Sequence, residues 1–383
     1  MKAIPVNPFS EYAPIRYEAT RPFAVPLGRE LLQHSARGEQ SRMAFLMGLH
    51  NERRMDRHLQ RIGRDVRGQV ISAEMTAFQV FATFLAGGRV IFDLDPVLMS
   101  NLCVTDIDDV PCGALSFPAK SFYLHFGAKS AVEEGAARVE GVFVDQIDDG
   151  RVAFHLAEVD YGSTGFAYAE PVQELWGPVM DFSDKDLAIE QALQQGLASM
   201  QESYSRSLAQ FEKELERIRS MFPGHDLEVP QAITELSPHR QEVMRKALRA
   251  AINAIFYLAH QDDSQEDWSR DVDPDDLKEL ARHDLKPGTR KTLENTLRNE
   301  GYRKVLFIGR RFAQSAQAIE VAKALGGHTG RTLATHFRRG HYRPQAYGEK
   351  WSLRKWIFVA PTVVNAHLAQ DMPGKIYEVR PER

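Results

Sequence analysis

An apolar side chain recurs every three or four positions between Ser183 and Phe222, and this stripe constrains the fold more than any other feature. Such spacing aligns the side chains along one face of a single long helix, which Pro223-Gly224 then ends. The stripe consists of Leu193, Leu197, Met200, Tyr204, Leu208, Phe211, Leu215, Ile218 and Phe222. Its aromatic members favour packing on the helix's own domain, while its length also fits a homodimer seam through residues 193–222.

Further helices are expected on both sides of this stripe. A helical pattern follows Pro26 and continues to Ile62 with a break near Gly38, and Ala73–Leu85 forms another segment that ends at Gly87-Gly88. Asp95 before Pro96 predicts an N-cap with proline in the first turn. Residues 238–260 and 288–300 complete the helical pattern, with a last helix over residues 312–325.

Strand-forming residues gather in two parts of the chain. In the middle, Val139–Val144 and Val152–Val159 flank Asp148-Asp149-Gly150, and an Asp-Gly turn between two such runs predicts a hairpin. The other expected strands are Ser121–Phe126, Lys304–Gly309, Thr332–Tyr342, Trp351–Val359 and Ile376–Val379. We therefore predict an α+β fold, in which long helices pack with two clusters of antiparallel strands, including a C-terminal basic-aromatic hairpin.

Composition along the chain suggests four regions. Residues 1–26 are rich in proline and are expected to form an extended arm. Residues 27–260 form the main α+β domain, which includes the long helix 183–222. Residues 261–285 hold ten Asp and Glu against three Lys and Arg, which indicates an acidic linker or loop. Residues 286–383 form a C-terminal α+β region that carries a basic motif.

Overall composition excludes several classes of protein. The formal net charge of −4 argues against a nucleic-acid coat protein but allows a local basic patch. The two cysteines, Cys103 and Cys112, lack partners at zinc spacing and do not form a disulfide framework, which fits a reducing cytoplasm. The start of the chain lacks the apolar core of a secretory signal, and Met75–Gly88 is too short to cross a membrane.

A basic and aromatic motif stands out in residues 336–343, which contain three arginines, two histidines and two aromatic residues. Between His328 and Trp356 there are seven Lys and Arg and one Glu. Arginine binds phosphate or carboxylate and aromatic rings stack on bases, so we expect a surface that binds RNA, an acidic peptide or a nascent chain. The predicted binding residues are His336, Arg338, Arg339, His341, Tyr342, Arg343, Arg354 and Trp356.

Two other interpretations of this motif stay open. It could be a basic edge strand that prevents aggregation and pairs with the acidic 261–285 segment. It could also be a metal-independent nuclease site, with His336 and His341 as acid and base and Arg339 neutralising a phosphate. Residues five apart on an ideal strand point to opposite faces, so the two histidines would need a bulge at Gly340.

We expect no cofactor and no metal site. The acidic clusters at Asp106, Asp108 and Asp109 and at Asp145, Asp148 and Asp149 have the composition of solvated turns, although either set could hold a divalent cation. The glycines of residues 326–330 lack the lysine and the spacing of a phosphate-binding loop.

The segment His336-Phe337-Arg338-Arg339-Gly340-His341-Tyr342 resembles a motif of the type V-A anti-CRISPR-like proteins, in particular the class that blocks production of the type V-A Cas nuclease. The strand with Arg354 and Trp356 and the segment 361–365 look similar to that family as well. The resemblance implies a protein of a mobile genetic element, a phage or plasmid, that evades host defence in the bacterial cytoplasm. It also implies an adaptor that recognises the N-terminal peptide of the nuclease during translation and causes loss of the message.

Three hypotheses on function result. The first, which we favour, is a non-enzymatic anti-CRISPR-like protein that binds a nascent polypeptide, RNA or the ribosome, without membrane contact. The second is a nuclease built on His336 and His341. The third is an oligomeric structural protein with its seam along residues 193–222.

Overall fold

The computed structural model describes residues 10–51, 53–61, 68–127, 133–134, 137–160, 175–221, 238–314, 336–338, 340–360 and 362–364. The helices of this part are α1 (Ala13–Thr20), α2 (Ala24–Ala36), α3 (Glu39–Asn51), α4 (Arg54–Arg61), α5 (Gly68–Ala86), α6 (Pro96–Cys103), α7 (Ile189–Met221), α8 (Pro238–His260), α9 (Pro274–Leu280) and α10 (Pro287–Glu300). The strands are β1 (Val90–Leu94), β2 (Ser121–His125), β3 (Glu133–Glu134), β4 (Ala137–Gln146), β5 (Arg151–Asp160), β6 (Leu175–Trp176), β7 (Val179–Asp181), β8 (Ser264–Trp268), β9 (Lys304–Ile308), β10 (His336–Arg338), β11 (His341–Tyr347), β12 (Leu353–Val359) and β13 (Thr362–Val364).

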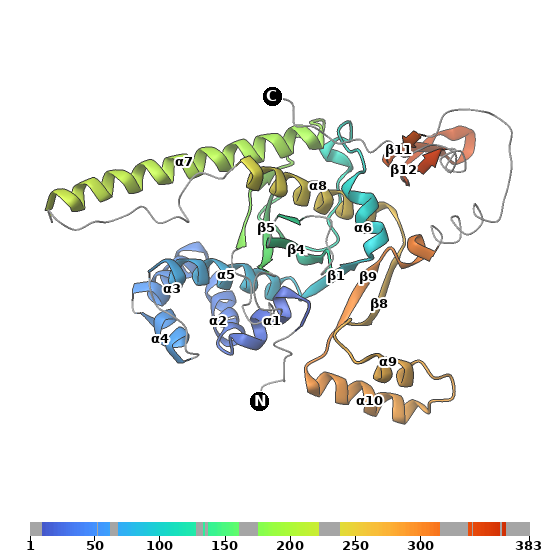
Figure 1. Cartoon of the computed structure of the whole chain (residues 1–383), viewed down its shortest axis with the longest axis horizontal. Helices are drawn as coiled ribbons and strands as arrows, with labels where there is room; N and C mark the ends of the chain where they lie inside the picture. Colours follow the sequence, from blue (N-terminus) through green and yellow to red (C-terminus); the bar gives the residue numbers. More distant parts are fainter. Residues whose placement is uncertain are drawn as a thin grey trace, which may run out of the picture.

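One mixed sheet forms the centre of the molecule (Figure 1). Its strands follow the order β6-β5-β4-β2-β1-β9-β8, with β3 beside β4 and β7 beside β5. β1 pairs in parallel with both β2 and β9, and the other pairs in this sheet are antiparallel. The predicted α+β class is confirmed. The parallel pairs were not predicted, because they join segments that are separated by long stretches of chain.

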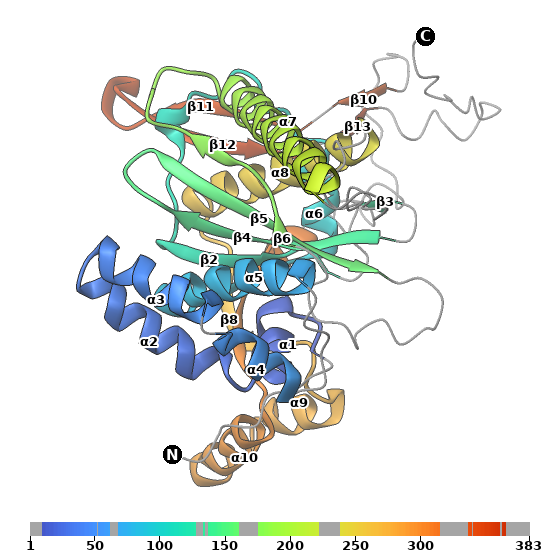
Figure 2. The ribbon, with the colours of Figure 1, turned by 90° about the vertical axis from the view of Figure 1, so that its left-hand side faces the viewer.

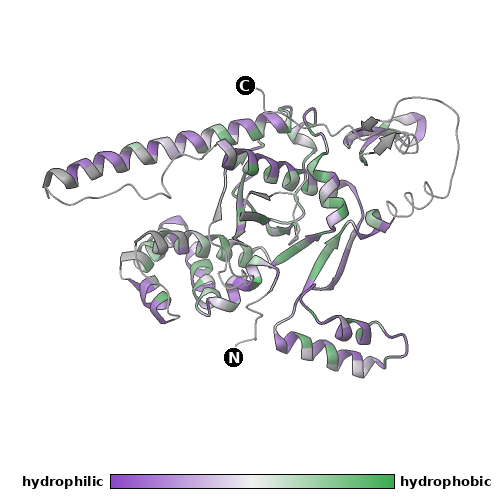
Figure 3. Cartoon of the chain, viewed as in Figure 1, coloured by the Kyte–Doolittle hydropathy of each residue, from purple (hydrophilic) through white to green (hydrophobic). Residues whose placement is uncertain are grey.

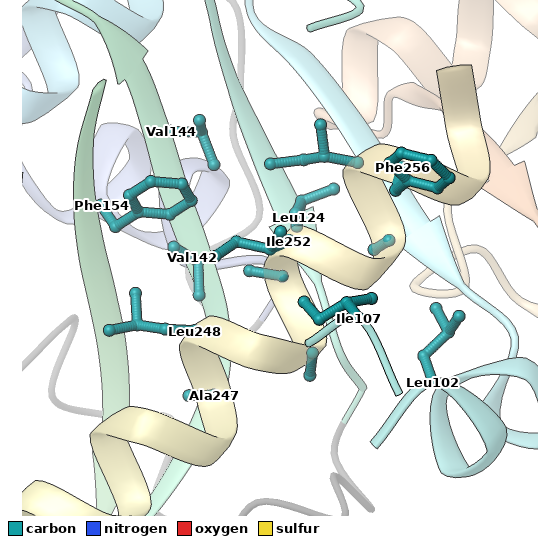
Figure 4. Packing of buried hydrophobic residues seen from close by; sticks show 14 of the residues in the cluster. Leu102, Ile107, Leu124, Val142, Val144, Phe154, Ala247, Leu248, Ile252 and Phe256 are labelled. Atoms are coloured by element: carbon teal, nitrogen blue, oxygen red, sulfur yellow. The ribbon is translucent and has the colours of Figure 1, made fainter. Parts of the chain in front are cut away.

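Helix α8 covers one face of the sheet and is buried along most of its length. Figure 4 shows Leu248 and Ile252 of this helix beside the strand residues Phe154 and Val142. All residues from Ala250 to Phe256 are fully buried, including the polar Asn253. A helix that is buried all round must contact structure on both sides, and α8 packs on the sheet, on α6 and on β12.

The opposite face of the sheet packs against α1 and α5. Tyr12, Tyr17, Phe81 and Phe84 lie in a cluster with the strand residues Ile91, Tyr123, Phe143 and Phe307. Helices α2 to α5 form a further helical layer around Phe23, Leu27, Leu49, Leu59 and Phe78. In Figure 2, the hairpin β11–β12, helix α8, the sheet and helix α5 follow one another as successive layers.

Helices α9 and α10 form a separate pair at the end of β8 and β9 (Figure 1), around a small apolar cluster that includes Trp268 and Leu297. β8 is an edge strand of mostly polar residues, and Figure 3 shows it hydrophilic beside the hydrophobic β9. Charged residues on an edge strand oppose pairing with another chain. β8 therefore closes this side of the sheet.

Several local predictions hold. The strands on either side of Asp148-Asp149-Gly150 form an antiparallel pair, β4 and β5. The carboxylate of Asp95 accepts a hydrogen bond from the Val97 N–H (2.8 Å) and caps α6, as predicted from Asp95-Pro96. The long helix is α7, which starts at Ile189 rather than Ser183 and projects past the sheet (Figure 1).

Three local predictions were wrong. The N-terminal segment is not extended after Ser10 but forms α1, whose first turn accommodates Pro14 because no intrahelical N–H bond is needed there. The acidic segment 261–285 contains β8 and α9, the latter capped by Asp273. The strand predicted over Thr332–Tyr342 is divided, since β10 pairs with β13 while β11 pairs with β12.

The division of the chain into domains stays a prediction, and the strand expected at Ile376–Val379 lies outside the described residues.

No helix among the described residues combines the length and the apolar character that crossing a lipid bilayer requires.

Glycine substitutions test the packing of the sheet. A Cβ at Gly141, which lies at an irregularity in β4, would overlap the Leu124 carbonyl oxygen and the Tyr123 hydroxyl. Gly141→Ala should therefore lower the free energy of unfolding by about 1–3 kcal/mol or more. Gly288→Ala, in open space on α10, should raise it by up to about 1 kcal/mol. Urea unfolding of both variants measures the difference, and equal effects would contradict the described packing.

Candidate binding site at the C-terminal hairpin

One face of the hairpin β11–β12 is packed against α8. The Tyr342 hydroxyl donates a hydrogen bond to the backbone oxygen of Asn253 (2.9 Å), and burial raises the pKa of this hydroxyl far above its usual range. The Tyr342 ring lies 4.4 Å from Phe256, and the Trp356 ring lies 5.6 Å from it, both edge to face. These contacts make the inner face of the hairpin part of the core.

The far end of the hairpin is exposed and combines apolar with basic side chains. Trp351 is 67% exposed, Leu353 51% and Tyr347 40%. Lys350, Arg354 and Lys355 are exposed around them, and Arg343 is exposed farther back along β11, opposite Ile357 of β12. We call these seven residues the hairpin tip. Large aromatic side chains are seldom so exposed without a partner, which makes this surface a candidate binding site.

Local backbone geometry holds Trp351 outward at the turn. Gly348, Lys350 and Trp351 all have positive φ angles, of 78°, 54° and 58°. This conformation is ordinary for glycine and costs about 1–2 kcal/mol for each other residue. The Arg354 guanidinium donates a hydrogen bond to the Trp351 carbonyl (2.6 Å) and so fixes the turn. Strained backbone of this kind concentrates at binding sites.

The charges of the hairpin tip are not neutralised within the described part of the chain. Arg343, Lys350 and Lys355 have no ion-pair partner there, and the Lys355 ammonium lies 5.7 Å from the centre of the Tyr347 ring. The acidic segment 261–285 is engaged elsewhere, for example Asp267 with Arg310. Among the described residues, the hairpin tip therefore carries free cations beside exposed rings.

The predicted binding residues fall into four groups. Arg343 and Arg354 belong to the hairpin tip, whereas Tyr342 and Trp356 face α8. His341 is half-buried where its strand meets Asp106, whose N–H donates to the Gly340 carbonyl (2.8 Å).

The remaining three residues are His336, Arg338 and Arg339. His336 and Arg338 lie on the backbone of β10, and their side chains, like Arg339, lie outside the described residues. The structure puts His336 and His341 on strands with different partners. The nuclease hypothesis stays a prediction.

Asp106, Asp108 and Asp148 of the acidic turns are engaged in hydrogen bonds or ion pairs. Asp148 accepts hydrogen bonds from Arg151, which lower the pKa of its carboxyl to about 2. Asp108 pairs with Arg249 (2.9 Å). The described residues contain no group of three or more His, Cys, Asp or Glu arranged as metal ligands.

Sequence reasoning missed a polar cluster at the carboxyl ends of β1 and β2, which we call the α1 junction. Asp93 of β1 accepts hydrogen bonds from the Tyr12 hydroxyl (2.6 Å) and the Arg270 guanidinium (2.7 and 2.9 Å). Asp271 accepts from the Ser10 hydroxyl (2.5 Å) and the Glu11 N–H (2.8 Å). The junction thereby joins α1 and the segment after β8 to the sheet.

His125 lies beside this junction and is completely buried. Its ring is 4.6 Å from that of Tyr12, and neither ring nitrogen has a hydrogen-bond partner in the described structure. Burial lowers the pKa of His125 to about 4, although the Asp93 carboxylate opposes the shift. A histidine and an aspartate inside otherwise apolar strand sequences were the signal available from the sequence.

The region that contains the sheet, α8 and the hairpin matches a known family. The model of the AcrVA2-like family, described as the anti-CRISPR type V subtype A2 family, matches residues 92–366, which is most of the chain. The chain belongs to this anti-CRISPR family. A solved structure titled "Crystal structure of AcrVA2" is 13% identical, covering 92% of this chain and 97% of that chain, with a TM-score of 0.42. Among curated proteins, none matches the chain.

Membership in this anti-CRISPR family agrees with the resemblance of residues 336–342 to a motif of type V-A anti-CRISPR-like proteins. The matched range begins in β1 and includes both the α8 core and the hairpin tip. Helices α1 to α5 precede it, so the α1 junction joins a segment outside the matched range to strands within it.

The α1 junction predicts how stability depends on pH. His125 binds its proton more weakly in the folded protein (pKa about 4) than in the unfolded chain (about 6.5), so stability falls as pH drops below about 6.5. In His125→Phe this contribution is absent. From pH 7.5 to pH 5 the wild type should lose about 2 kcal/mol more than the variant.

Urea unfolding of both proteins at the two pH values measures this difference. Other titrating groups are present in both proteins and cancel in the comparison. Because the variant also removes two buried nitrogens without partners, its stability at pH 7.5 should equal or exceed that of the wild type. Identical pH dependence in the two proteins would contradict the described burial of His125.

Proposed function

We propose that this anti-CRISPR protein acts by binding. It contacts RNA through the hairpin tip, recognises the polypeptide that this RNA encodes, and so blocks expression of a Cas nuclease. Family membership supports the anti-CRISPR role. The observation that carries the RNA contact is the pairing of exposed rings with unpaired cations on the hairpin tip. The polypeptide target and the bacterial cytoplasm are the expectations drawn from the resemblance.

Single-stranded RNA suits this surface better than a duplex. Trp351 and Tyr347 offer faces on which unpaired bases stack, and each stacked base contributes about 1–3 kcal/mol. Arg343, Lys350 and Lys355 can bind the phosphates that link those bases. The inner face of the hairpin is fixed on α8, so the tip is presented on a rigid support rather than on a free loop.

Trp351→Ala should weaken RNA binding about 5- to 100-fold, because one stacking platform is lost. The double variant Arg343→Ala with Lys355→Ala should weaken binding and also reduce its salt dependence, since up to two phosphate contacts are removed. The measurement is fluorescence anisotropy of a labelled 12-nucleotide oligouridine with the purified full-length chain at several salt concentrations.

The matched control is Arg290→Ala with Lys291→Ala, which removes two exposed cations from α10. This variant should bind the oligouridine as the wild type does. If the control and the hairpin double variant weaken binding equally, the tip is not the RNA site. Shortening of the labelled RNA that His341→Gln abolishes would favour the nuclease hypothesis instead.

A cellular experiment tests the effect on expression. In bacteria that carry a type V-A Cas nuclease, the wild-type protein should lower both the nuclease and its message, and Trp351→Ala should restore them toward the level without the anti-CRISPR protein. Immunoblotting and quantitative RNA measurement provide the two readouts. Full repression by Trp351→Ala would contradict a role for the hairpin tip.

A homodimer through α7 stays a prediction. Leu193 is fully buried in the core of its own chain, and Leu197, Met200 and Tyr204 pack against that core. We expect such a seam to use mainly the part of α7 beyond Tyr204. Light scattering of the full-length chain would decide between monomer and dimer.

A further inference from the structure

Helix α4 and the residue before it carry a row of exposed arginines on the outside of the helical layer. Within residues 53–61, the exposed side chains are Arg53, Arg57, Gln60 and Arg61. Arg57 and Arg61 are four residues apart, so they lie about 6 Å apart on one face of the helix. The Arg53 carbonyl accepts the Arg57 N–H (3.2 Å), which puts Arg53 one turn before Arg57. We call Arg53, Arg57 and Arg61 the arginine face.

The sequence around the arginine face is strongly basic. Residues 53–67 hold six arginines and two aspartates, in a chain whose formal net charge is −4. They contain no lysine. Arginine presents a planar fork of donors that fits phosphate oxygens, whereas lysine offers a point charge. Because this segment precedes residues 92–366, the match to the family model does not account for its composition.

The other side of α4 anchors the helix in the helical layer. Met55 and Leu59 are fully buried in the apolar cluster of this layer. The Arg54 guanidinium pairs with Glu30 (3.2 Å), so this arginine is engaged within the layer. The fold itself covers the apolar side of α4, which is therefore not available for insertion into a lipid surface. The arginine face is held on a rigid support.

The positive charge of the arginines acts on neighbouring groups. Burial lowers the pKa of His58, and the charges of the α4 arginines lower it further, that of Arg61 most. Arg53 and Arg61 form no ion pair with a carboxylate of the described residues. Arg53 also has a φ angle of 52°, in the region that favours glycine, and strained backbone of this kind concentrates at binding sites. A bound polyanion would neutralise this concentrated charge.

The surface around the arginine face lacks the rings that single-stranded RNA requires. The phenylalanine and tyrosine side chains of residues 10–61 are all buried, namely Tyr12, Tyr17, Phe23 and Phe45. Unpaired bases therefore have no exposed phenyl or phenol ring here on which to stack. A duplex presents phosphates at high density and keeps its bases stacked inside, so contacts to its backbone need cations and no rings.

We propose that the arginine face binds the phosphate backbone of a base-paired RNA stem, without regard to its sequence. The guanidinium forks of Arg53, Arg57 and Arg61 contact phosphates of the stem. The hairpin tip, on the opposite side of the central sheet (Figure 2), takes the unpaired bases. The inference rests on the proposed function in one respect, since the nucleic acid is RNA because the proposed target is a message.

The test uses the purified full-length chain and a labelled, blunt-ended RNA duplex of about 16 base pairs, which offers the hairpin tip no unpaired base. Arg53→Gln with Arg61→Gln should weaken binding at least about fivefold at low salt. The same variant should reduce the slope of log K against log salt concentration by up to about 1.8, because two phosphate contacts are lost. Arg53→Lys with Arg61→Lys keeps both charges and should keep the slope. Fluorescence anisotropy at several salt concentrations measures both quantities.

The matched control is Arg290→Gln with Lys291→Gln, which removes two exposed cations from α10 and should leave duplex binding unchanged. Urea unfolding confirms that each variant is folded. Absence of duplex binding by the wild type, or equal weakening in the control and in the arginine-face variant, would overturn the inference. The same duplex made of DNA distinguishes the source of the phosphates. RNA should be bound at least as tightly as DNA, and tighter binding to DNA would overturn the assignment to RNA.

The arginine face and the hairpin tip can fail separately. Arg53→Gln with Arg61→Gln should retain oligouridine binding, and Trp351→Ala should retain duplex binding. Loss of duplex binding in Trp351→Ala would instead place the stem at the hairpin and overturn the proposal for the arginine face.

Discussion

The burial of helix α8 on two sides is the constraint on which the rest of the structure depends. Its side chains from Ala250 to Phe256 have no solvent exposure, so the helix needs the sheet on one side and α6 and the hairpin on the other. Asn253 shows how closely the two sides are linked. Its side-chain amide donates to the Leu102 and Thr105 carbonyls, and its own backbone oxygen accepts the Tyr342 hydroxyl. The position of the hairpin is thus fixed by the core.

This arrangement explains why the hairpin has two chemically different faces. Tyr342 and Trp356 gain more from contact with Phe256 than from exposure, because burying an aromatic side chain removes a large apolar area from water. The same burial turns the other end of the hairpin outward, with Trp351 and its neighbouring cations in solvent. A rigid inner face and an exposed tip are consistent with a surface used for binding.

The sequence was sufficient to predict the structure where the interactions that determine it are local. The Asp-Gly turn between β4 and β5, the Asp95 cap and the extent of α8 follow from neighbouring residues, and the structure has all three. The pairing of β1 with β9 joins segments about two hundred residues apart, and no local pattern specifies it. The helix α1 was missed because proline was taken as a sign of extended chain, although its first turn tolerates Pro14.

For the candidate sites, too, local features could be predicted from the sequence and long-range contacts could not. Alternation along a strand puts neighbours such as Tyr342 and Arg343 on opposite faces, but it does not say which of them faces the core, since that depends on where α8 lies. The α1 junction escaped notice because it gathers residues from distant segments. Asp93 contacts Tyr12 and Arg270 only in the folded chain.

The most direct measurement of the central claim is to cross-link bound RNA to the full-length protein with ultraviolet light and to map the modified residues by mass spectrometry. Cross-links are expected on β11, β12 and the turn between them, with Tyr347 and Trp351 foremost. Cross-links confined to α10 or to the helices α1 to α5, with none on the hairpin tip, would contradict it.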